Sequence, residues 1–337
     1  MEKKSILLVY VNFSSFVKAD FEILSSFTNV TKYQFKPVKG ILHTGVELLK
    51  ELLFLIFKGH KYEGIFIWFS DYHSLLPVLY AKLFKKKSYV VIGGYDVSTL
   101  EEYGYGAFSQ PLRAFFTRNT FKYVDFCFPV ADALRKKLLE INPHVRAETL
   151  ATVTDSVKFS FSEYQRAQRI ITVSGTANYQ RLMVKGLDRF RELATYLPEF
   201  EFIIIGITEG AKKYFETVPE NLILVPPTEF EKLVPNYQQA SFYAQLSRSE
   251  GLPNALCEAM LCGCIPVGTD VGDIRITIGE SGLTLDNWNP EIVAEYIRQN
   301  HNKTHLRNLS RDQIVKLYDN GKRADRFRSL ILKPVNL

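Results

Sequence analysis

Short apolar runs recur along the whole chain, separated by longer segments that mix apolar and polar residues. Runs this short are typical of strands buried on both faces of a parallel sheet, whereas the longer segments have helical spacing. The runs fall at residues 6–11, 64–69, 89–92 and 125–129 in the first half, and at 169–174, 200–205, 222–225, 242–246 and 265–267 in the second. This alternation predicts an α/β fold of two doubly wound, Rossmann-like domains that face each other across a cleft.

The 337 residues suggest two domains rather than one. Polar residues of low periodicity at 160–168 separate the two alternating halves and indicate a linker. We therefore predict a first domain at residues 1–160 and a second at 161–310. A closing helix within residues 311–337 is expected to cross back to the first domain.

The stretch from residue 244 to 282 carries the most informative pattern. A short strand ends in a serine-rich loop, Glu250 and Gly251 break the alternation, Pro253 suits a first helical position, and Gly263 suits the helix end. A helix start presents unpaired backbone N–H groups and the positive end of the helix dipole, so it attracts phosphate. Glycine at position 251 lets the backbone approach such a ligand closely.

Two carboxylates, Glu250 and Glu258, bracket this proposed anion site at different heights. An ionised carboxylate accepts hydrogen bonds and can take two neighbouring hydroxyls at once. A nucleotide sugar carries a diphosphate between two polyhydroxy rings, so acids around a phosphate site indicate this ligand rather than a purely anionic one. The alternative is an ordinary surface helix that bears acidic residues.

The spacing of Glu250 and Glu258, with Glu-Gly after a serine-rich strand end and Glu-Ala-Met inside the helix, resembles glycosyltransferase family 4. Members of that family are retaining enzymes of the GT-B fold. The resemblance implies that Glu258 holds the ribose hydroxyls of the donor and that Glu250 holds the transferred sugar. It also implies that the backbone around Leu252, Asn254 and Ala255 meets the diphosphate.

Lys185 precedes a glycine at the start of a predicted helix in the second half. The family has a Lys-Gly pair here whose lysine neutralises the diphosphate, and a lysine at a helix start is otherwise unfavourable for the dipole. The family's partner arginine usually stands next to the glycine that ends the preceding strand, but here Gly175 is followed by Thr176. Arg181 is a displaced candidate for that role. The resemblance implies no metal and no cofactor besides the nucleotide diphosphate sugar substrate.

In the first half, the loop after residues 89–92 resembles the acceptor-side loop of the family, with Gly94 and Asp96 in place and Gly93 where a histidine is usual. Asp96 is a candidate catalytic group that orients or deprotonates an acceptor hydroxyl. It is equally a turn aspartate that bonds its own backbone. Lys18 and Asp20 follow the first strand and are candidates for acceptor contact, with a helix cap as the alternative for Asp20.

The net charge of +6 lies entirely in the first half, where residues 1–160 hold 21 Lys and Arg against 15 Asp and Glu. A basic face can meet an anionic membrane surface, a phosphorylated acceptor or nucleic acid, and it can also serve only to keep the protein in solution. No nucleic acid is expected. The helix expected at residues 45–58 carries more Leu and Phe than a single stripe needs, so it packs inside or touches a membrane or a partner.

No apolar run approaches the length of a membrane span, and the apolar start of the chain is too short for a signal peptide. We therefore expect a cytoplasmic protein, with peripheral binding to the inner face of the membrane as an option. Three of the four cysteines crowd the motif helix, at positions 257, 262 and 264, with no histidine nearby. They are expected to be small buried thiols rather than metal ligands.

These patterns and the resemblance together predict a retaining, hexosyl-type glycosyltransferase. It would move a sugar from a nucleotide diphosphate sugar to a hydroxyl of a glycan, growing or lipid-linked. Two alternatives stay open: a nucleotide-sugar epimerase on the same architecture, and a non-catalytic partner subunit that keeps the fold. Hydride transfer is disfavoured because no phosphate-binding glycine fingerprint follows the first strand.

Overall fold

The computed structural model describes residues 3–36, 40–152, 155–161, 166–176, 178–318 and 320–332. The chain divides into two compact units, one of residues 1–153 with 320–337 and one of residues 154–319. The sequence placed the corresponding boundaries at 160/161 and 310/311. The closing helix begins at Asn320, after a break that separates it from the preceding helix.

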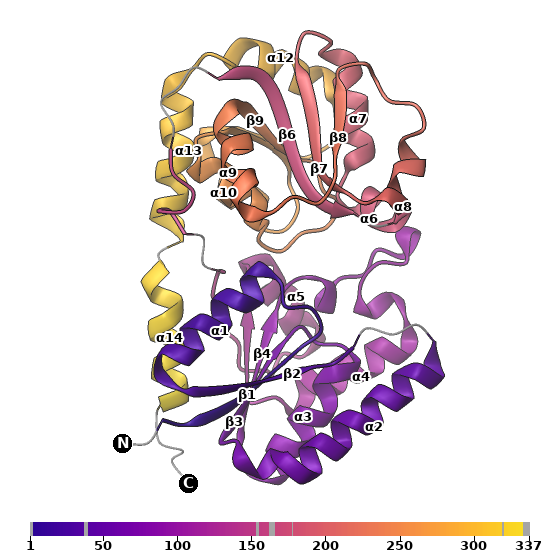
Figure 1. The fold of residues 1–337 in the computed structure, drawn as a ribbon, viewed down its shortest axis with the longest axis vertical. Helices are drawn as coiled ribbons and strands as arrows, with labels where there is room; N and C mark the ends of the chain where they lie inside the picture. The colour runs from indigo at the N-terminus through magenta and orange to yellow at the C-terminus, as the bar shows by residue number, and fades with distance from the viewer. Residues whose placement is uncertain are drawn as a thin grey trace. The chain divides into compact units, whose positions relative to one another are not determined.

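The first unit contains a five-stranded parallel sheet in the order β2-β1-β3-β4-β5. Its strands are β1 (Ser5–Tyr10), β2 (Asn29–Gln34), β3 (Gly64–Trp68), β4 (Lys87–Ile92) and β5 (Phe126–Pro129). The helices are α1 (Ser15–Phe27), α2 (Ile41–Lys58), α3 (Tyr72–Leu83), α4 (Pro111–Tyr123), α5 (Asp132–Ile141) and α14 (Asn320–Leu332). Figure 1 shows α1 and α14 on one face of this sheet and α2, α3 and α4 on the other.

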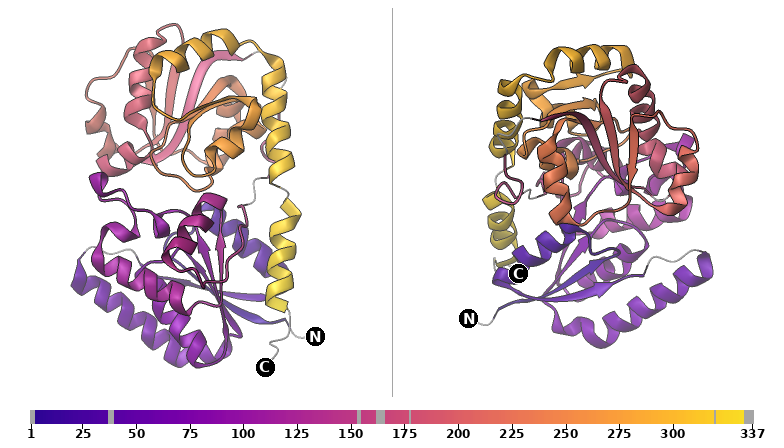
Figure 2. Two further views of the ribbon diagram at one scale, coloured as in Figure 1. Left: turned by 180° about the vertical axis from the view of Figure 1, so that it is seen from behind. Right: turned by 45° about the horizontal axis from the view of Figure 1, so that its top comes forward.

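The second unit contains a six-stranded parallel sheet in the order β11-β10-β9-β6-β7-β8. Its strands are β6 (Ala167–Thr176), β7 (Glu201–Ile207), β8 (Leu222–Val225), β9 (Ala240–Gln245), β10 (Ile265–Thr269) and β11 (Leu283–Leu285). The helices are α6 (Tyr179–Val184), α7 (Leu187–Tyr196), α8 (Glu209–Lys212), α9 (Phe230–Gln239), α10 (Asn254–Leu261), α11 (Ile274–Ile278), α12 (Pro290–Asn300) and α13 (Thr304–Leu317). Helices α7 and α12 pack together, as do α10 and α13, which Figure 2 shows from two further sides.

These two sheets, each wound on both sides by helices, confirm the predicted fold class. The apolar runs became the central strands: the side chains of β1, β3 and β4 are almost entirely buried, as parallel sheets require. The sequence analysis missed β2 and β11, which lie at the edges of the two sheets. The edge position leaves most of β2 exposed, so its residues carry no apolar run.

A buried ion pair fastens α14 to the rest of the first unit. Arg323 donates from Nε and Nη2 to the two carboxylate oxygens of Asp20 on α1, each at 2.6 Å, and both side chains are almost fully buried. Arg323 Nη1 also donates to the carbonyl oxygens of Leu150 and Ala151. The guanidinium lies 4.9 Å from the ring centre of Phe327. Every face of this cation is therefore satisfied by a residue of the same unit.

The pair overturns the two roles predicted for Asp20, which neither caps α1 nor faces an acceptor. Asp20 lies inside α1, with 1% of its surface exposed. The side chain of Lys18 is exposed, and its Nζ lies 3.9 Å from Oε1 of Glu22. Contact between Lys18 and an acceptor stays a prediction.

Replacing Arg323 by Met should lower the free energy of unfolding by about 3–5 kcal/mol, because Asp20 is left buried without its partner. Urea unfolding measures the change. Arg328→Met on the same helix is the matched control, because its side chain is half exposed and its change should stay within about 0.5 kcal/mol. The double variant Asp20→Leu with Arg323→Met should recover most of the loss. If Arg323→Met and Arg328→Met had equal free energies of unfolding, the role assigned to the Asp20–Arg323 pair would be contradicted.

Candidate functional site

The candidate site of the second unit lies where the order of strands in the sheet reverses. β6 and β9 are neighbours, and the chain runs outward from them in opposite directions, through β7 and β8 on one side and β10 and β11 on the other. Ligands of open parallel sheets bind beyond the carboxyl ends of the strands at such a switch point. Lys185 follows β6 and Glu250 follows β9, so the two residues reach this edge from opposite sides of the reversal.

The turn after α6 is pressed against the end of β9. Gly186 has a φ of +67°, and a Cβ at this position would lie 1.9 Å from the carbonyl oxygen of Leu246. Next to this contact, the backbone N–H of Arg248 donates to the carbonyl oxygen of Val184 at 2.8 Å. The two loops therefore meet at backbone distance, and this approach places Lys185 beside the loop that follows β9.

A charged clamp holds the same two loops together. Arg248 donates from Nη1 and Nη2 to the two carboxylate oxygens of Asp188 on α7, both at 2.7 Å. Its Nη1 also donates to the carbonyl oxygen of Met183 at 2.6 Å. Bidentate pairs of this kind fix geometry as well as adding attraction.

Glu250 is the centre of a compact polar network. Its Oε1 accepts from Lys185 Nζ at 2.5 Å, from Ser247 Oγ at 2.9 Å and from Gln245 Nε2 at 3.0 Å. The side chain of Glu250 is 9% exposed and that of Lys185 is 22% exposed. Glu250 is therefore paired with a lysine that keeps partial access to solvent, as a group that meets an anionic ligand must.

Glu258, in the middle of α10, has a different environment. Its Oε2 accepts from the hydroxyl of the buried Tyr237 at 3.1 Å. Burial raises the pKa of Glu258 to about 7, although the bond from Tyr237 acts in the opposite direction. Burial together with the negative charges of Glu258 and Glu250 also raises the pKa of Tyr243, whose hydroxyl donates to Gln245. Tyr243 is thus within electrostatic reach of both acids that the sequence singled out.

The residues predicted to meet the diphosphate lie at the start of α10. Gly251 and Leu252 are buried, and Asn254 and Ala255 lie in the first turn of α10. The backbone N–H of Asp273, from the loop after β10, donates to the carbonyl oxygen of Gly251 at 3.1 Å. The first N–H groups of a helix have no partner within the helix, so this turn can present donors to an anion.

Arg181 lies on α6, four residues before Lys185, and its side chain is exposed. Its backbone N–H donates to the side-chain oxygen of Asn178, which caps α6, and its carbonyl oxygen accepts from the N–H of Lys185. Within the described residues its guanidinium bonds to none of Lys185, Glu250 or Glu258. A role for Arg181 at the diphosphate stays a prediction.

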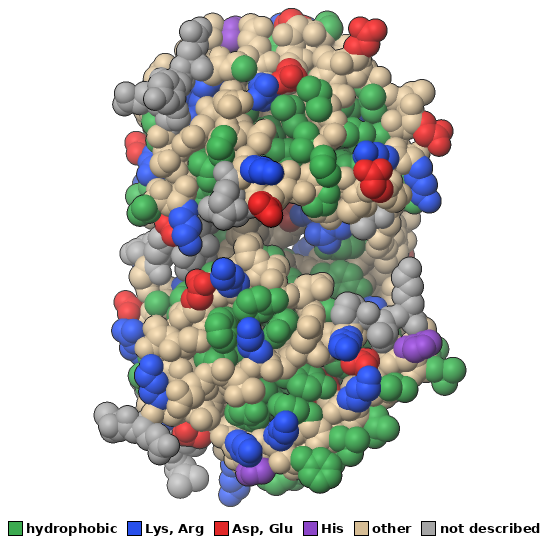
Figure 3. All heavy atoms as spheres, in the orientation of Figure 1, with side chains coloured by type: hydrophobic (Ala, Val, Ile, Leu, Met, Phe, Trp, Pro, Cys, Tyr) green, Lys and Arg blue, Asp and Glu red, His purple; other side chains and the backbone are tan. Residues whose placement is uncertain are grey.

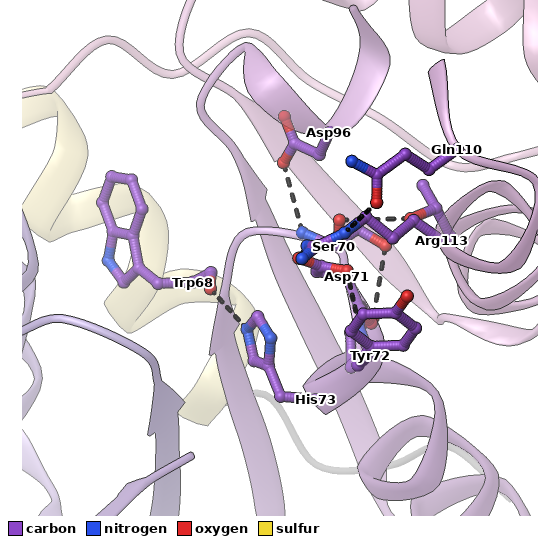
Figure 4. A network of polar contacts seen from close by, with 10 residues as sticks. Trp68, Ser70, Asp71, Tyr72, His73, Asp96, Gln110 and Arg113 are labelled. Atoms are coloured by element: carbon purple, nitrogen blue, oxygen red, sulfur yellow. Dashed lines mark hydrogen bonds and ion pairs between the residues drawn. The ribbon is translucent and has the colours of Figure 1, made fainter. Parts of the chain in front are cut away.

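Asp96 lies in the first unit and is fully buried. Its carboxylate accepts from the backbone N–H groups of Gly94 at 2.9 Å and of Gly93 and Ser70 at 3.3 Å, and Figure 4 shows the bond to Ser70. Burial raises the pKa of Asp96 to about 7 against the opposing effect of these donors. In this structure Asp96 ties the loop after β4 to the loop after β3, and its catalytic role stays a prediction.

The loop after β3 carries a second polar cluster, also seen in Figure 4. Asp71 caps α3 and pairs with Arg113 from α4. Arg113 Nε donates to Gln110 at 2.9 Å, and its guanidinium lies 4.7 Å from the ring centre of Tyr72. This arginine is placed by three neighbours at the edge of the sheet where β3 and β4 end.

Sequence reasoning missed several residues of the network around Glu250. Tyr243, Gln245 and Ser247 recur at every second position along β9 and beyond its end, so they share one face of the strand. That alternation of polar groups inside a buried strand was the available signal. The partnership of Arg248 with Asp188 joins positions 60 residues apart, and no local pattern announces it.

The described residues contain no group of three His, Cys, Asp or Glu side chains arranged to hold a metal ion. The four cysteines are free and buried, and the Sγ of Cys264 donates to the carbonyl oxygen of Tyr237 at 3.1 Å. The thiols therefore pack in the core of their units, as expected.

Comparison with protein families matches residues 168–302 to the family described as glycosyl transferases group 1. The match covers most of the second unit and includes Lys185, Glu250 and Glu258. No curated protein sequence matches the chain.

Solved structures similar to this chain include three that span nearly all of it. Sucrose-phosphate synthase from Thermosynechococcus elongatus has a TM-score of 0.78 at 13% identity and covers 98% of both chains. HepE from Anabaena, in complex with UDP-glucose, has a TM-score of 0.76 at 10% identity and covers 97% of this chain and 99% of its own. A glycosyltransferase from Rickettsia africae has a TM-score of 0.71 at 12% identity, with 99% and 100% covered. The fold is therefore that of the GT-B glycosyltransferases.

Gly186→Ala should lower the free energy of unfolding by at least about 1 kcal/mol, because the left-handed φ strains any L residue and the new methyl group collides with Leu246. Thermal unfolding measures the loss. Gly210→Ala is the matched control in the same unit, since no atom lies within 4 Å of its Cβ position. If both variants melted alike, the close approach of the two loops would be refuted.

Glu258 should make stability depend on pH. Its pKa is higher in the folded protein than the ordinary 4.5. Its contribution to the free energy of unfolding is therefore fully present below about pH 4 and is lost as the pH rises through about 7. Glu258→Gln cannot ionise and should gain stability relative to the wild type, on the order of 2–3 kcal/mol, between pH 5 and pH 8.

Urea unfolding at intervals across this range measures the difference for Glu258. The exposed Glu209→Gln is the control and should show no such trend. A difference for Glu258→Gln that stays constant with pH would contradict the raised pKa.

Proposed function

We propose that the protein is a retaining glycosyltransferase that moves a hexosyl group from a nucleotide diphosphate sugar to a hydroxyl acceptor. The main support for this proposal is the network in which Glu250 and Lys185 meet at the switch point of the second sheet, beside the start of α10. The family match over residues 168–302 supports the same reaction class.

In this proposal each group of the site meets the part of the donor that suits its charge. Lys185 and the first turn of α10 bind the diphosphate, because both present positive charge or N–H donors. Glu250 accepts hydrogen bonds from hydroxyls of the sugar, and Glu258 accepts them from the ribose. Lys185 then exchanges part of its contact with Glu250 for the phosphate oxygens.

The reaction breaks the bond between the anomeric carbon and the phosphate oxygen and forms a bond from that carbon to the acceptor oxygen. The acceptor oxygen attacks on the same face that the phosphate leaves, which gives retention, and the acceptor proton passes to the leaving phosphate. Negative charge grows on the leaving diphosphate, and fixed positive groups that await this charge lower the barrier. Lys185 and the α10 start supply that stabilisation, so the reaction needs no metal ion.

The choice of first substrates rests on the similar structures. HepE from Anabaena was solved with UDP-glucose, and the pneumococcal O-GlcNAc transferase GtfA, which is similar over 79% of this chain, with UDP and GlcNAc. We therefore propose UDP-hexoses as the first donors to test. The acceptor is proposed to be a growing or lipid-linked glycan on the cytoplasmic side, with Asp96 and Arg181 as further site residues.

Lys185→Gln should lower turnover by about 10²–10³-fold, the usual loss when one group that stabilises transition-state charge is removed. Glu250→Gln should lower turnover strongly while nucleotide binding persists. Release of nucleoside diphosphate measures the rate, and NMR of the product measures the anomeric configuration. Lys212→Gln is the control, because Lys212 forms an exposed pair with Glu209 in the same unit.

An unchanged rate for Glu250→Gln would defeat its assignment. Change of the donor sugar itself without any acceptor would establish an epimerase instead. Nucleotide binding with neither transfer nor slow donor hydrolysis would establish a non-catalytic subunit.

A further inference from the structure

Helix α2 exposes an apolar stripe along its whole length. Eight large apolar side chains of this helix are each at least 39% exposed: Ile41, Leu42, Val46, Leu49, Leu52, Leu53, Ile56 and Phe57. Figure 3 shows such side chains along the lower right edge, where Figure 1 places α2. A helix of 18 residues is about 27 Å long, so the stripe is larger than the scattered apolar residues of an ordinary surface.

The polarity of the two faces of α2 is the reverse of that of an ordinary surface helix in water. The face toward the protein holds Glu47, 6% exposed, and Glu51, 1% exposed. Neither carboxylate oxygen of Glu51 accepts a hydrogen bond from a described residue, and burial raises its pKa well above the ordinary range. A surface helix in water turns its apolar stripe inward and its charges outward. The opposite arrangement is favourable where the medium outside the helix is apolar.

The apolar surface continues onto the neighbouring helices. α3 packs beside α2, and its end exposes Leu83 and then Phe84, at 76% and 54%. α4 packs beside α3 and exposes Phe115 at 58%. Lys86 Nζ donates to the carbonyl oxygen of His60 at 3.1 Å, which joins the end of α2 to the end of α3. We call the exposed face of residues 41–61 and 79–87 the α2 surface.

The α2 surface is predominantly basic. Residues 41–61 and 79–87 contain seven lysines, at positions 50, 58, 61, 82, 85, 86 and 87, and the two buried glutamates of α2 are the acids in these ranges. Lys50 pairs with Glu47, and Lys87 pairs with Asp125 from outside these ranges. Beside this surface lies a pocket of about 610 Å³ whose charged lining is mostly basic, with Lys82, Lys85, Lys122 and Arg146 among its residues and Asp125 as its acid. Apolar side chains flanked by lysines match the interface of a bilayer that carries anionic lipids.

We propose that the α2 surface docks on an anionic lipid bilayer, with α2 lying in the interface between headgroups and acyl chains. No helix in the described parts of the chain is long and apolar enough to cross a bilayer. A second copy of the chain fits this surface poorly, because two such faces would bring their lysines together, and the acids beside Lys50 and Lys87 are already paired with those lysines. The proposal does not depend on the sugar-transfer reaction.

Vesicle flotation of the full-length protein tests the docking. The wild type should bind vesicles of phosphatidylcholine with about a third phosphatidylglycerol and lose binding in phosphatidylcholine alone or in about 1 M salt. Leu49→Glu with Phe57→Glu should weaken binding at least tenfold, because two exposed anchors become charged. Lys58→Gln with Lys61→Gln and Lys85→Gln should weaken it about as much. Ile276→Glu with Val315→Glu changes equally exposed residues of the second unit and should bind like the wild type.

Binding that survives Leu49→Glu with Phe57→Glu, or equal binding to neutral vesicles, would overturn the proposal. So would a failure to bind any vesicle. Sedimentation velocity without lipid tests whether a second copy of the chain occupies the surface instead. If the wild type is a dimer, the double variant Leu49→Glu with Phe57→Glu is a monomer, and no vesicle is bound, the surface is assigned to a second copy. Donor hydrolysis in solution should be unchanged in the docking variants, which separates this result from a failure of the catalytic proposal.

Discussion

The close approach of Gly186 to the end of β9 is the constraint on which the second unit's site depends. A side chain at this position would occupy the space of the Leu246 carbonyl group, so only glycine lets the turn after α6 lie against the loop after β9. The clamp of Arg248 on Asp188 then holds the two loops in register. Lys185 and Glu250, which are far apart in the sequence, meet because the backbone around them is fixed in this way.

The two acids of the site, Glu250 and Glu258, have different surroundings. Glu250 accepts hydrogen bonds from three side-chain donors, one of which is the cation of Lys185. Glu258 has one neutral donor in a buried setting, so its pKa is high. Buried polar groups that are only partly satisfied cost stability and are common at functional sites. Asp96 in the first unit also has a raised pKa, but three backbone donors satisfy it, which is typical of a carboxylate that shapes a loop.

The fold was predictable wherever burial is total, because central parallel strands need unbroken apolar runs. Edge strands such as β2 lack that pattern and were missed. Within the site, the glutamates stand in one recognisable local motif and Lys185 in another, and the structure brings Lys185 and Glu250 into contact. The pairing of Asp20 with Arg323 spans 303 positions and depends on how α14 packs, so no local pattern contains it. The reversed polarity of α2 was equally hidden, because composition shows apolar content but not which face points outward.

The most direct test of the central claim is hydrogen–deuterium exchange of the full-length protein with and without UDP. The account predicts slower exchange in peptides that cover residues 183–190 and 247–258, because the nucleotide would bind the turn at Lys185 and the start of α10. Peptides from the end of α12, where Arg298 bonds to Tyr196 and Glu199 at the opposite end of α7 from Lys185, should be unchanged. Protection confined to other segments, with residues 183–190 and 247–258 unaffected, would contradict the placement of the donor site.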